Sequence, residues 1–272
     1  MSSHLVPVTG APQNRILAAL PAADWKRVKR YLSVLETPAG RTLCEFGSQL
    51  DYAYFPATAI ISVLHVARDG ASTEIAATGN EGLVGINLFM GVGAPSSRVA
   101  VQNTGCIYRL EKEILQDEFN RGGAMQHLLL RYTHALFTVI SQTAVCNQRH
   151  SIVQQVCRWL LLSLDRLDSD QLIMTHELLA NTLGVRREGI TEAAHKLQAA
   201  GLIAYRRGRI TVVDRMGLEA VCCECYRVVR REYDRLPQFN PDIMPSAPLD
   251  GEEPPAVAPA EVVESCLDAC AT

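Results

Sequence analysis

The sequence lacks both a long apolar run and a secretory start. No uninterrupted apolar stretch approaches the roughly 18 residues that a membrane-spanning helix needs, and no apolar segment follows a basic N-terminus. The nine cysteines are odd in number and scattered, which is not typical of a disulfide framework. We therefore expect neither a signal peptide nor a membrane contact, and we predict a protein of the reducing cytoplasm.

The sequence also lacks a cluster of histidines. A metal enzyme built on a small β-barrel usually needs several histidines and a carboxylate close together. The chain has seven histidines, and His65 alone falls within its strand-rich segment. Catalysis is therefore not expected, and no catalytic residue, metal ligand or cofactor is assigned.

Basic residues are missing from one end of the chain. Residues 237–272 hold seven of the thirteen prolines, seven acidic residues and no Lys or Arg. Such a segment cannot bury enough apolar surface to fold, so we predict a disordered acidic tail. The chain's net charge is −3 and this tail contributes −7, so the other 236 residues sum to +4.

Residues 174–214 are the most informative stretch. Thr175 is a plausible N-cap for a helix in which the apolar residues Leu178, Leu179 and Leu183 repeat at helical spacing, and Gly184 is suited to end it. A second helix follows with Ile190, Ala193, Ala194 and Leu197 on its apolar face. Two strands, Leu202–Tyr205 and Ile210–Val213, are then joined by Arg206-Arg207-Gly208-Arg209. This order predicts a winged helix-turn-helix.

The outward face of the second helix carries groups that read bases. Arginine donates a paired hydrogen bond to guanine, and glutamate accepts one from cytosine, so Arg187 and Glu188 predict contacts in a major groove. The wing arginines would hold phosphates beside it. The alternative is an ordinary surface helix with solvated charges. The predicted DNA-binding residues are Thr175, Arg186, Arg187, Glu188, Thr191, Glu192, Arg207 and Arg209.

These motifs resemble the Crp/Fnr family of bacterial transcription regulators. The shared pattern is Thr175, Ala180, Gly184, Arg187-Glu188, Ile190 and Gly201-Leu202-Ile203. The resemblance implies base contacts for Arg187 and Glu188 and a phosphate contact for Thr175. The chain departs at Glu192, where many relatives have arginine, and at Gly189, where threonine is usual. Both departures leave the operator sequence open.

Seven short strand-like runs precede this domain. They are Thr42–Phe46, Tyr52–Phe55, Ala59–Val66, Thr73–Ala77, Gly85–Phe89, Ser97–Gln102 and Gly105–Leu110. Such density predicts an antiparallel roll of the double-stranded β-helix type, and the family resemblance implies a cyclic-nucleotide-type effector domain. A helical pattern over Gln13–Leu35, divided at Pro21, precedes the roll.

The effector of this domain is not cyclic AMP in our interpretation. In relatives that bind cyclic AMP, a glutamate after the glycine matching Gly85 grips the ribose, whereas this chain has Ile86. Arg98 follows Ser97, so the anion-binding pair is displaced. A small-molecule effector therefore stays open, with Gly85, Asn87, Ser97 and Arg98 as the candidate pocket.

A long helix is expected to make a homodimer. Beyond Arg121-Gly122-Gly123, apolar or small residues recur in steps of four and three, which is typical of a coiled-coil seam. The predicted dimer residues are Leu129, Tyr132, Leu136, Val139 and Thr143. Packing on the chain's own roll is the alternative, and both can hold on different faces.

A helix over Gly217–Leu236 is expected after the wing, and it includes Cys222, Cys223 and Cys225. A continuous helix would point Cys222 and Cys223 about 100° apart, so buried or surface thiols are favoured over a metal or iron–sulfur site.

The sequence thus predicts an α+β chain in five parts. They are a flexible start (1–14), a β-roll sensor (15–120), a dimerisation helix and hinge (121–150), a winged helix-turn-helix (151–236) and the tail (237–272). The expected function is a sequence-specific, homodimeric transcription regulator that binds a double-stranded DNA operator. RNA polymerase is a further candidate partner. The alternative is a small-molecule or cyclic-nucleotide sensor that acts through protein partners.

Overall fold

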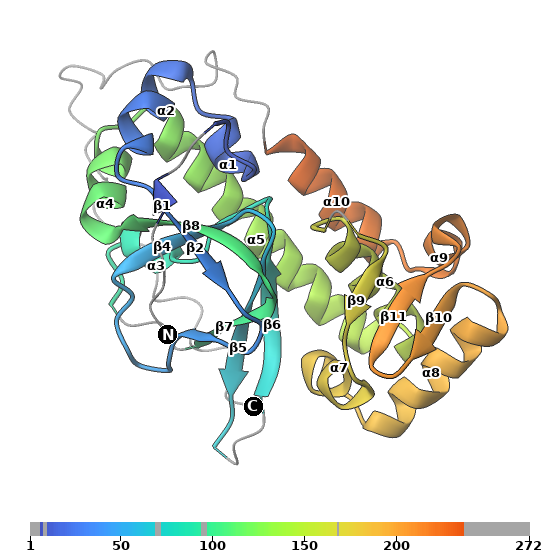
Figure 1. Cartoon of the computed structure of the whole chain (residues 1–272). Helices are drawn as coiled ribbons and strands as arrows, with labels where there is room; N and C mark the ends of the chain where they lie inside the picture. The colour runs from blue at the N-terminus through green and yellow to red at the C-terminus, as the bar shows by residue number, and fades with distance from the viewer. Residues whose placement is uncertain (1–5, 8–9, 69–71, 94–96, 168, 237–272) are drawn as a thin grey trace, which may run out of the picture. The chain divides into compact units, whose positions relative to one another are not determined.

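The computed structural model describes residues 6–7, 10–68, 72–93, 97–167 and 169–236, and the predicted tail at 237–272 lies outside the described residues. An N-terminal roll of two sheets leads into one long helix, and a helical segment with a small third sheet follows (Figure 1). The predicted α+β class is confirmed. Within the described residues, no helix is long and apolar enough to cross a membrane.

The roll consists of two four-stranded sheets in which every pairing is antiparallel. The first sheet has the order β1 (Val6–Pro7), β2 (Ser33–Thr37), β8 (Gly105–Glu111) and β4 (Tyr52–Pro56). The second has the order β3 (Thr42–Cys44), β7 (Arg98–Asn103), β5 (Ile60–Val66) and β6 (Ser72–Thr78). Six of the seven predicted strands are therefore present, each shifted by no more than a few residues.

Two predictions about elements in or next to the roll are wrong. The run Gly85–Phe89 is not a strand: Gly85 has a φ of 116°, and the short helix α3 (Ile86–Phe89) begins after it. Glycine permits this backbone conformation without a Cβ clash. The end of the predicted N-terminal helix is also wrong, because residues 33–37 form β2 and pair with β8. Tertiary pairing has overridden the helical spacing there.

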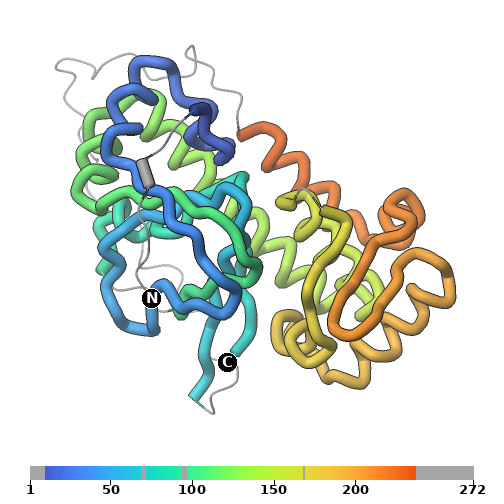
Figure 2. Tube along the Cα trace, in the orientation of Figure 1, coloured from blue at the N-terminus to red at the C-terminus, as the bar shows by residue number. Residues whose placement is uncertain are grey.

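The breaks between the helices around the roll fall at proline and glycine, as the sequence predicts. Pro21 occupies the N-cap position of α2 (Ala22–Lys29) and separates it from α1 (Arg15–Ala18). Gly122 and Gly123 both have positive φ, and they separate α4 (Lys112–Asn120) from α5 (Ala124–Arg149). Figure 2 follows the chain from the roll through α5 into the C-terminal helices.

The N-terminal segment is more ordered than its composition predicts. Residues 6–7 pair with β2, and the Asn14 side chain is completely buried. Its amide nitrogen donates to the carbonyl oxygens of Pro56 (2.9 Å) and Gly82 (2.8 Å). Its oxygen accepts from the backbone N–H groups of Ile16 and Leu17 and so caps α1. The assignment of residues 1–14 as flexible is therefore corrected for its described part.

We expect Asn14→Ala to lower the free energy of unfolding by about 2–3 kcal/mol. The change removes a helix cap and leaves two buried carbonyl oxygens without their donor. Urea unfolding followed by circular dichroism measures the loss. Asn103→Ala is the control, because the Asn103 amide donates only to the neighbouring Thr104 carbonyl at an exposed site. Equal stability of the two variants would contradict the role of Asn14.

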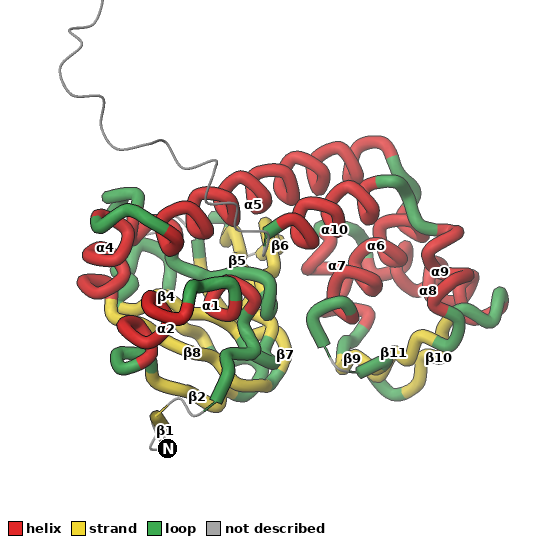
Figure 3. The backbone as a smooth tube through the Cα atoms, turned by 90° about the horizontal axis from the view of Figure 1, so that it is seen from above, coloured by secondary structure: helices red, strands yellow, loops and turns green. Residues whose placement is uncertain are grey.

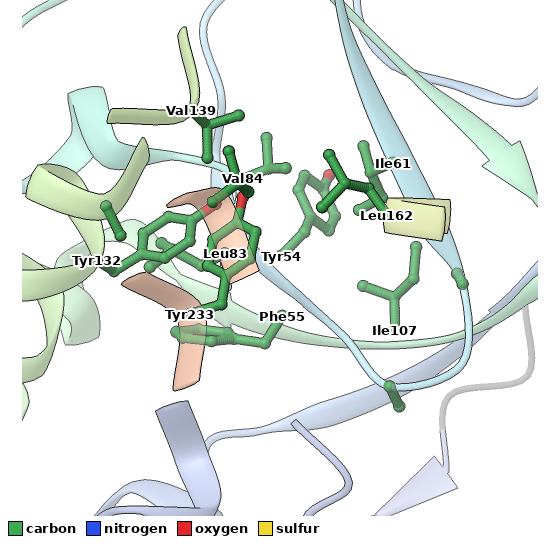
Figure 4. Packing of buried hydrophobic residues seen from close by; sticks show 14 of the residues in the cluster. Tyr54, Phe55, Ile61, Leu83, Val84, Ile107, Tyr132, Val139, Leu162 and Tyr233 are labelled. Atoms are coloured by element: carbon green, nitrogen blue, oxygen red, sulfur yellow. The ribbon is translucent and has the colours of Figure 1, made fainter. Parts of the chain in front are cut away.

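The long helix α5 turns its predicted dimer residues inward. Leu129 and Tyr132 are 0% exposed and Val139 is 4% exposed within the single chain. The Tyr132 hydroxyl lies 3.0 Å from Thr78 Oγ1, and Figure 4 shows Tyr132 among the buried side chains around Leu83. The heptad steps thus mark the face that packs on the chain's own core. The predicted dimer seam is corrected accordingly, because these three side chains are not available to a partner.

The C-terminal helices surround a three-stranded sheet. The elements are α6 (Ile152–Leu164), β9 (Gln171–Ile173), α7 (His176–Leu183), α8 (Arg187–Ala199), β10 (Ile203–Arg206), β11 (Arg209–Val212), α9 (Arg215–Val221) and α10 (Cys225–Arg235). The sheet order is β10-β11-β9, and both pairings are antiparallel. The predicted helix over 217–236 is two helices, with a break at residues 222–224, and α10 packs on α5 (Figure 3).

Candidate nucleic-acid interface

Helices α7 and α8 form the predicted helix-turn-helix. The Thr175 hydroxyl accepts the backbone N–H of Leu178 at 3.1 Å, so it caps α7. Gly184 ends α7 in the left-handed conformation, with a φ of 67°. The inner face of α8 buries Ile190, Ala193, Ala194 and Leu197. Local cap, turn and periodicity signals therefore place this motif as the sequence predicts.

The opposite face of α8 is polar, exposed and slightly hollowed. The hollow is lined by Arg187, Glu188, Thr191, Glu192 and His195, and all five are exposed. Arg186 stands at the N-cap without a side-chain cap bond, so the first N–H groups of α8 have no side-chain acceptor there. Free N–H groups at a helix N-terminus suit an anion such as a phosphate. Arg187 and Glu188 therefore project from the helix end that would enter a groove.

Two ion pairs on this face hold their side chains only weakly. The Arg187 Nε lies 3.8 Å from Glu177 Oε2, and both side chains are about two-thirds exposed. Lys196 Nζ lies 2.7 Å from Glu192 Oε1, and the hydrogen bond from Lys196 lowers the pKa of Glu192. Exposed pairs of this kind contribute little to stability. Arg187 can therefore exchange its carboxylate partner for a base edge at little cost.

His176, which was not among the predicted DNA-binding residues, connects α7 and α8 to the wing. The His176 ring stacks on Tyr205, with centroids 4.4 Å apart, and its Nδ1 lies 3.1 Å from Thr191 Oγ1. Burial and the nearby Arg187 lower the pKa of His176, which favours its neutral form. The Tyr205 hydroxyl donates to the Met174 carbonyl at 2.8 Å. This contact between elements distant in sequence has no local sequence signal.

The wing presents three arginines around a tight turn. Arg207 and Gly208 have φ values of 52° and 73°, which is typical of a two-residue type I′ hairpin turn. Arg206, Arg207 and Arg209 are exposed and line a second shallow hollow. The Gly208 carbonyl accepts the Met174 N–H at 2.8 Å, so the turn lies beside Thr175. Arg206 was not among the predicted DNA-binding residues, although it adjoins them.

Gly189 lies where α6 approaches α8 closely. A Cβ added to Gly189 would lie 2.6 Å from Ile152 Cδ1 of α6, closer than carbon atoms approach one another. Helix α6 therefore approaches α8 at this point, and a larger residue would force Ile152 to shift. Because Ile152 Cδ1 is the far end of a flexible side chain, this shift would cost little.

The candidate effector residues lie apart from an obvious anion site. The Arg98 guanidinium is 3.2 Å from Glu45 Oε1 and donates to Thr42 Oγ1 at 3.0 Å, so a carboxylate already neutralises it. Asn87 donates to the Gly93 carbonyl at 3.1 Å. Gly85 begins α3, and Ser97 is buried before β7. The four residues remain a prediction.

Comparison with known proteins identifies the type of the C-terminal domain. Residues 154–221 match the family model of the Crp-like helix-turn-helix domain. Among curated proteins, no sequence gives a significant match.

Solved structures show the same fold over most of the chain. A CRP-family transcriptional regulator from Thermus thermophilus aligns with a TM-score of 0.58 and 17% identity, covering 68% of this chain and 95% of the other. FixK2 from Bradyrhizobium japonicum aligns with a TM-score of 0.60 and 13% identity, covering 71% and 98%. The c-di-GMP responsive global regulator CLP of Xanthomonas campestris aligns with a TM-score of 0.52 and 17% identity, covering 71% and 99%.

These matches agree with the resemblance read from the sequence. The chain has the fold of Crp/Fnr regulators and carries a Crp-like helix-turn-helix. The first finding is the fold, and the second indicates a DNA-binding domain at residues 154–221.

Proposed function

We propose that this chain is a homodimeric transcription regulator in which α8 reads a DNA operator through Arg187 and Glu188. One observation carries the proposal: the exposed face of α8, led by Arg187 and Glu188, accompanies a wing with three exposed arginines. The helix end would enter the major groove, and the wing would contact phosphates beside it. Thr175 and Arg186 would hold the backbone at the start of the two helices.

The homodimer forms through a different face of α5 from the one that the heptad steps indicated. Leu130, Phe137, Ile140 and Ala144 are exposed, and we name these four the outer face of α5. Their steps of seven, three and four residues place them in one stripe. Two such stripes would pack across a two-fold axis and set the two α8 helices one helical turn of DNA apart.

The roll would act as a sensor for an effector other than cyclic AMP. Ile86 offers no acceptor for a ribose hydroxyl, and Arg98 is paired with Glu45 at 3.2 Å. A buried ribose hydroxyl without a partner would cost about 1–3 kcal/mol. The sensor and α8 would be coupled through α5, whose inner face packs on the roll.

Selection from a randomised duplex library tests the function directly. Full-length protein is incubated with the library, and bound fragments are sequenced over several rounds. We expect enrichment of an inverted repeat with half-sites about 10–10.5 base pairs apart, as two-fold symmetry requires. Absence of any enriched sequence would overturn the proposal.

Two single substitutions separate base reading from phosphate binding. Arg187→Ala should weaken operator binding by about 1–3 kcal/mol per half-site and relax one base position, with little effect on random DNA. Arg207→Ala, the matched control on the wing, should weaken both DNAs alike and reduce the salt dependence. Gel shifts at several salt concentrations measure both. An equal loss on operator and random DNA for Arg187→Ala would contradict base reading.

A further inference from the structure

Three cysteines and one histidine from distant parts of the sequence meet near the end of α5. Cys146 and His150 come from the end of α5, while Cys223 lies in the break before α10 and Cys225 is the first residue of α10. Their ligand atoms, three Sγ atoms and one imidazole nitrogen, all lie within 4.8 Å of one another. The three cysteines are buried, and the His150 side chain is 13% exposed.

The spacing of these atoms fits a tetrahedral metal site. Cys146 Sγ lies 3.6 Å from Cys223 Sγ, and Cys225 Sγ lies 3.6 Å from His150 Nδ1. Zinc bonds sulfur at about 2.3 Å and histidine nitrogen at about 2.0 Å, so the edges of a tetrahedron around it measure about 3.8 Å between sulfurs and about 3.5 Å between sulfur and nitrogen. The two distances match these edges. Three thiolates and one imidazole are a common ligand set of structural zinc.

Neighbouring charged groups support an ion at this place. Glu224 Oε1 lies 3.3 Å from His150 Nε2, so the carboxylate can accept a hydrogen bond from Nε2–H while Nδ1 binds a metal. Carboxylates commonly orient metal-binding histidines in this way. Arg158 is buried beside Cys146, and its Nε lacks a hydrogen-bond partner. This guanidinium would offset the net negative charge of three thiolates around a divalent ion.

We propose that Cys146, His150, Cys223 and Cys225 bind one zinc ion per chain. On one continuous helix over 217–236 the cysteines would point apart, and this geometry favoured simple thiols. The break between α9 and α10 removes the premise of that argument. The ion would connect the end of α5 to the start of α10. These two elements lie on either side of the hinge between α5 and α6, which leads into the DNA-binding domain.

Metal analysis of the full-length protein tests the site without reference to DNA. Protein purified under reducing conditions without chelators or a metal-affinity tag should carry one equivalent of zinc by plasma mass spectrometry. Exchange with Co²⁺ should give a thiolate-to-cobalt charge-transfer band and the intense visible bands of tetrahedral cobalt. Absence of zinc together with absence of these bands would overturn the proposal. Iron with acid-labile sulfide, or an intact mass 2 Da low from a Cys146–Cys223 disulfide, would also overturn it.

Matched variants show which residues hold the ion. Cys225→Ser and His150→Ala should each lose most of the bound zinc. Cys222→Ser should keep one equivalent, because Cys222 adjoins the cluster but is not among its four ligand-bearing residues. Equal zinc content in Cys222→Ser and Cys225→Ser would contradict the assignment. The cobalt spectrum of the unaltered chain decides the matter even if a variant fails to fold.

Removal of the ion should loosen the hinge. Chelator treatment should lower the Tm of the unaltered protein by about 10 °C, because a tightly bound ion stabilises only the folded state. Cys225→Ser should show no change with chelator. An unchanged Tm in the unaltered protein would show that the site does not stabilise the fold, whatever the outcome of DNA binding.

Discussion

Arg166→Met is expected to lower the free energy of unfolding by about 3–5 kcal/mol, because it leaves the buried Glu81 carboxylate without its partner. The Arg166 Nε donates to Glu81 Oε1 at 2.9 Å, and both side chains are less than a tenth exposed. Arg166 follows α6, whereas Glu81 follows β6 of the roll, so the pair joins the two halves of the described chain. Arg166 also donates to the Ala77 carbonyl at 2.9 Å and lies against the Tyr233 ring.

A double-mutant cycle separates this pair from general packing. Arg166→Met combined with Glu81→Gln removes both charges, so its loss should be much smaller than that of Arg166→Met alone. Glu192→Ala is the control, since Glu192 pairs with Lys196 on the exposed face of α8 and its loss should leave the stability almost unchanged. Urea unfolding measures the unaltered protein, the two single variants, the double variant and the control. Additive losses in the cycle would show that the two buried charges do not stabilise one another.

The helix-turn-helix could be predicted because its signals are local. Thr175 caps α7 through a hydrogen bond three residues away, and Gly184 adopts the left-handed conformation that few other residues favour. The wing follows from a turn of two residues with positive φ between short strands. Each of these features depends on neighbours in the sequence, so residue type and spacing are sufficient to predict them.

The features that the sequence did not predict depend on contacts between distant residues. Cys146 and Cys223 are 77 positions apart, and their meeting requires α10 to lie against α5. The sequence predicted one continuous helix over 217–236, whereas the chain breaks at residues 222–224, and no local pattern connected Cys146 and His150 with the later cysteines. Similarly, α5 has apolar residues on two faces, and periodicity cannot tell which face meets the roll.

A substitution on the outer face of α5 should also have a large effect, on the association of two chains. Phe137 is 71% exposed at the centre of the outer face of α5, between Leu130 and Ala144. An aromatic side chain of this size on one helix face is typical of a residue that anchors a protein–protein contact. In a two-fold dimer, each substitution occurs twice, so its cost is doubled.

We therefore expect Phe137→Glu to convert the proposed dimer into a folded monomer. A loss of about 2 kcal/mol at each copy would raise the dimer Kd by about a thousandfold. Sedimentation equilibrium measures the Kd. A gel shift should show weaker binding to the two-half-site operator, and circular dichroism should show an unchanged fold. Met216→Glu is the matched control, because Met216 is an exposed apolar residue of α9, outside the outer face of α5. A Phe137→Glu protein that stays dimeric would move the dimer contact away from α5, since Leu129, Tyr132 and Val139 are already buried in their own chain.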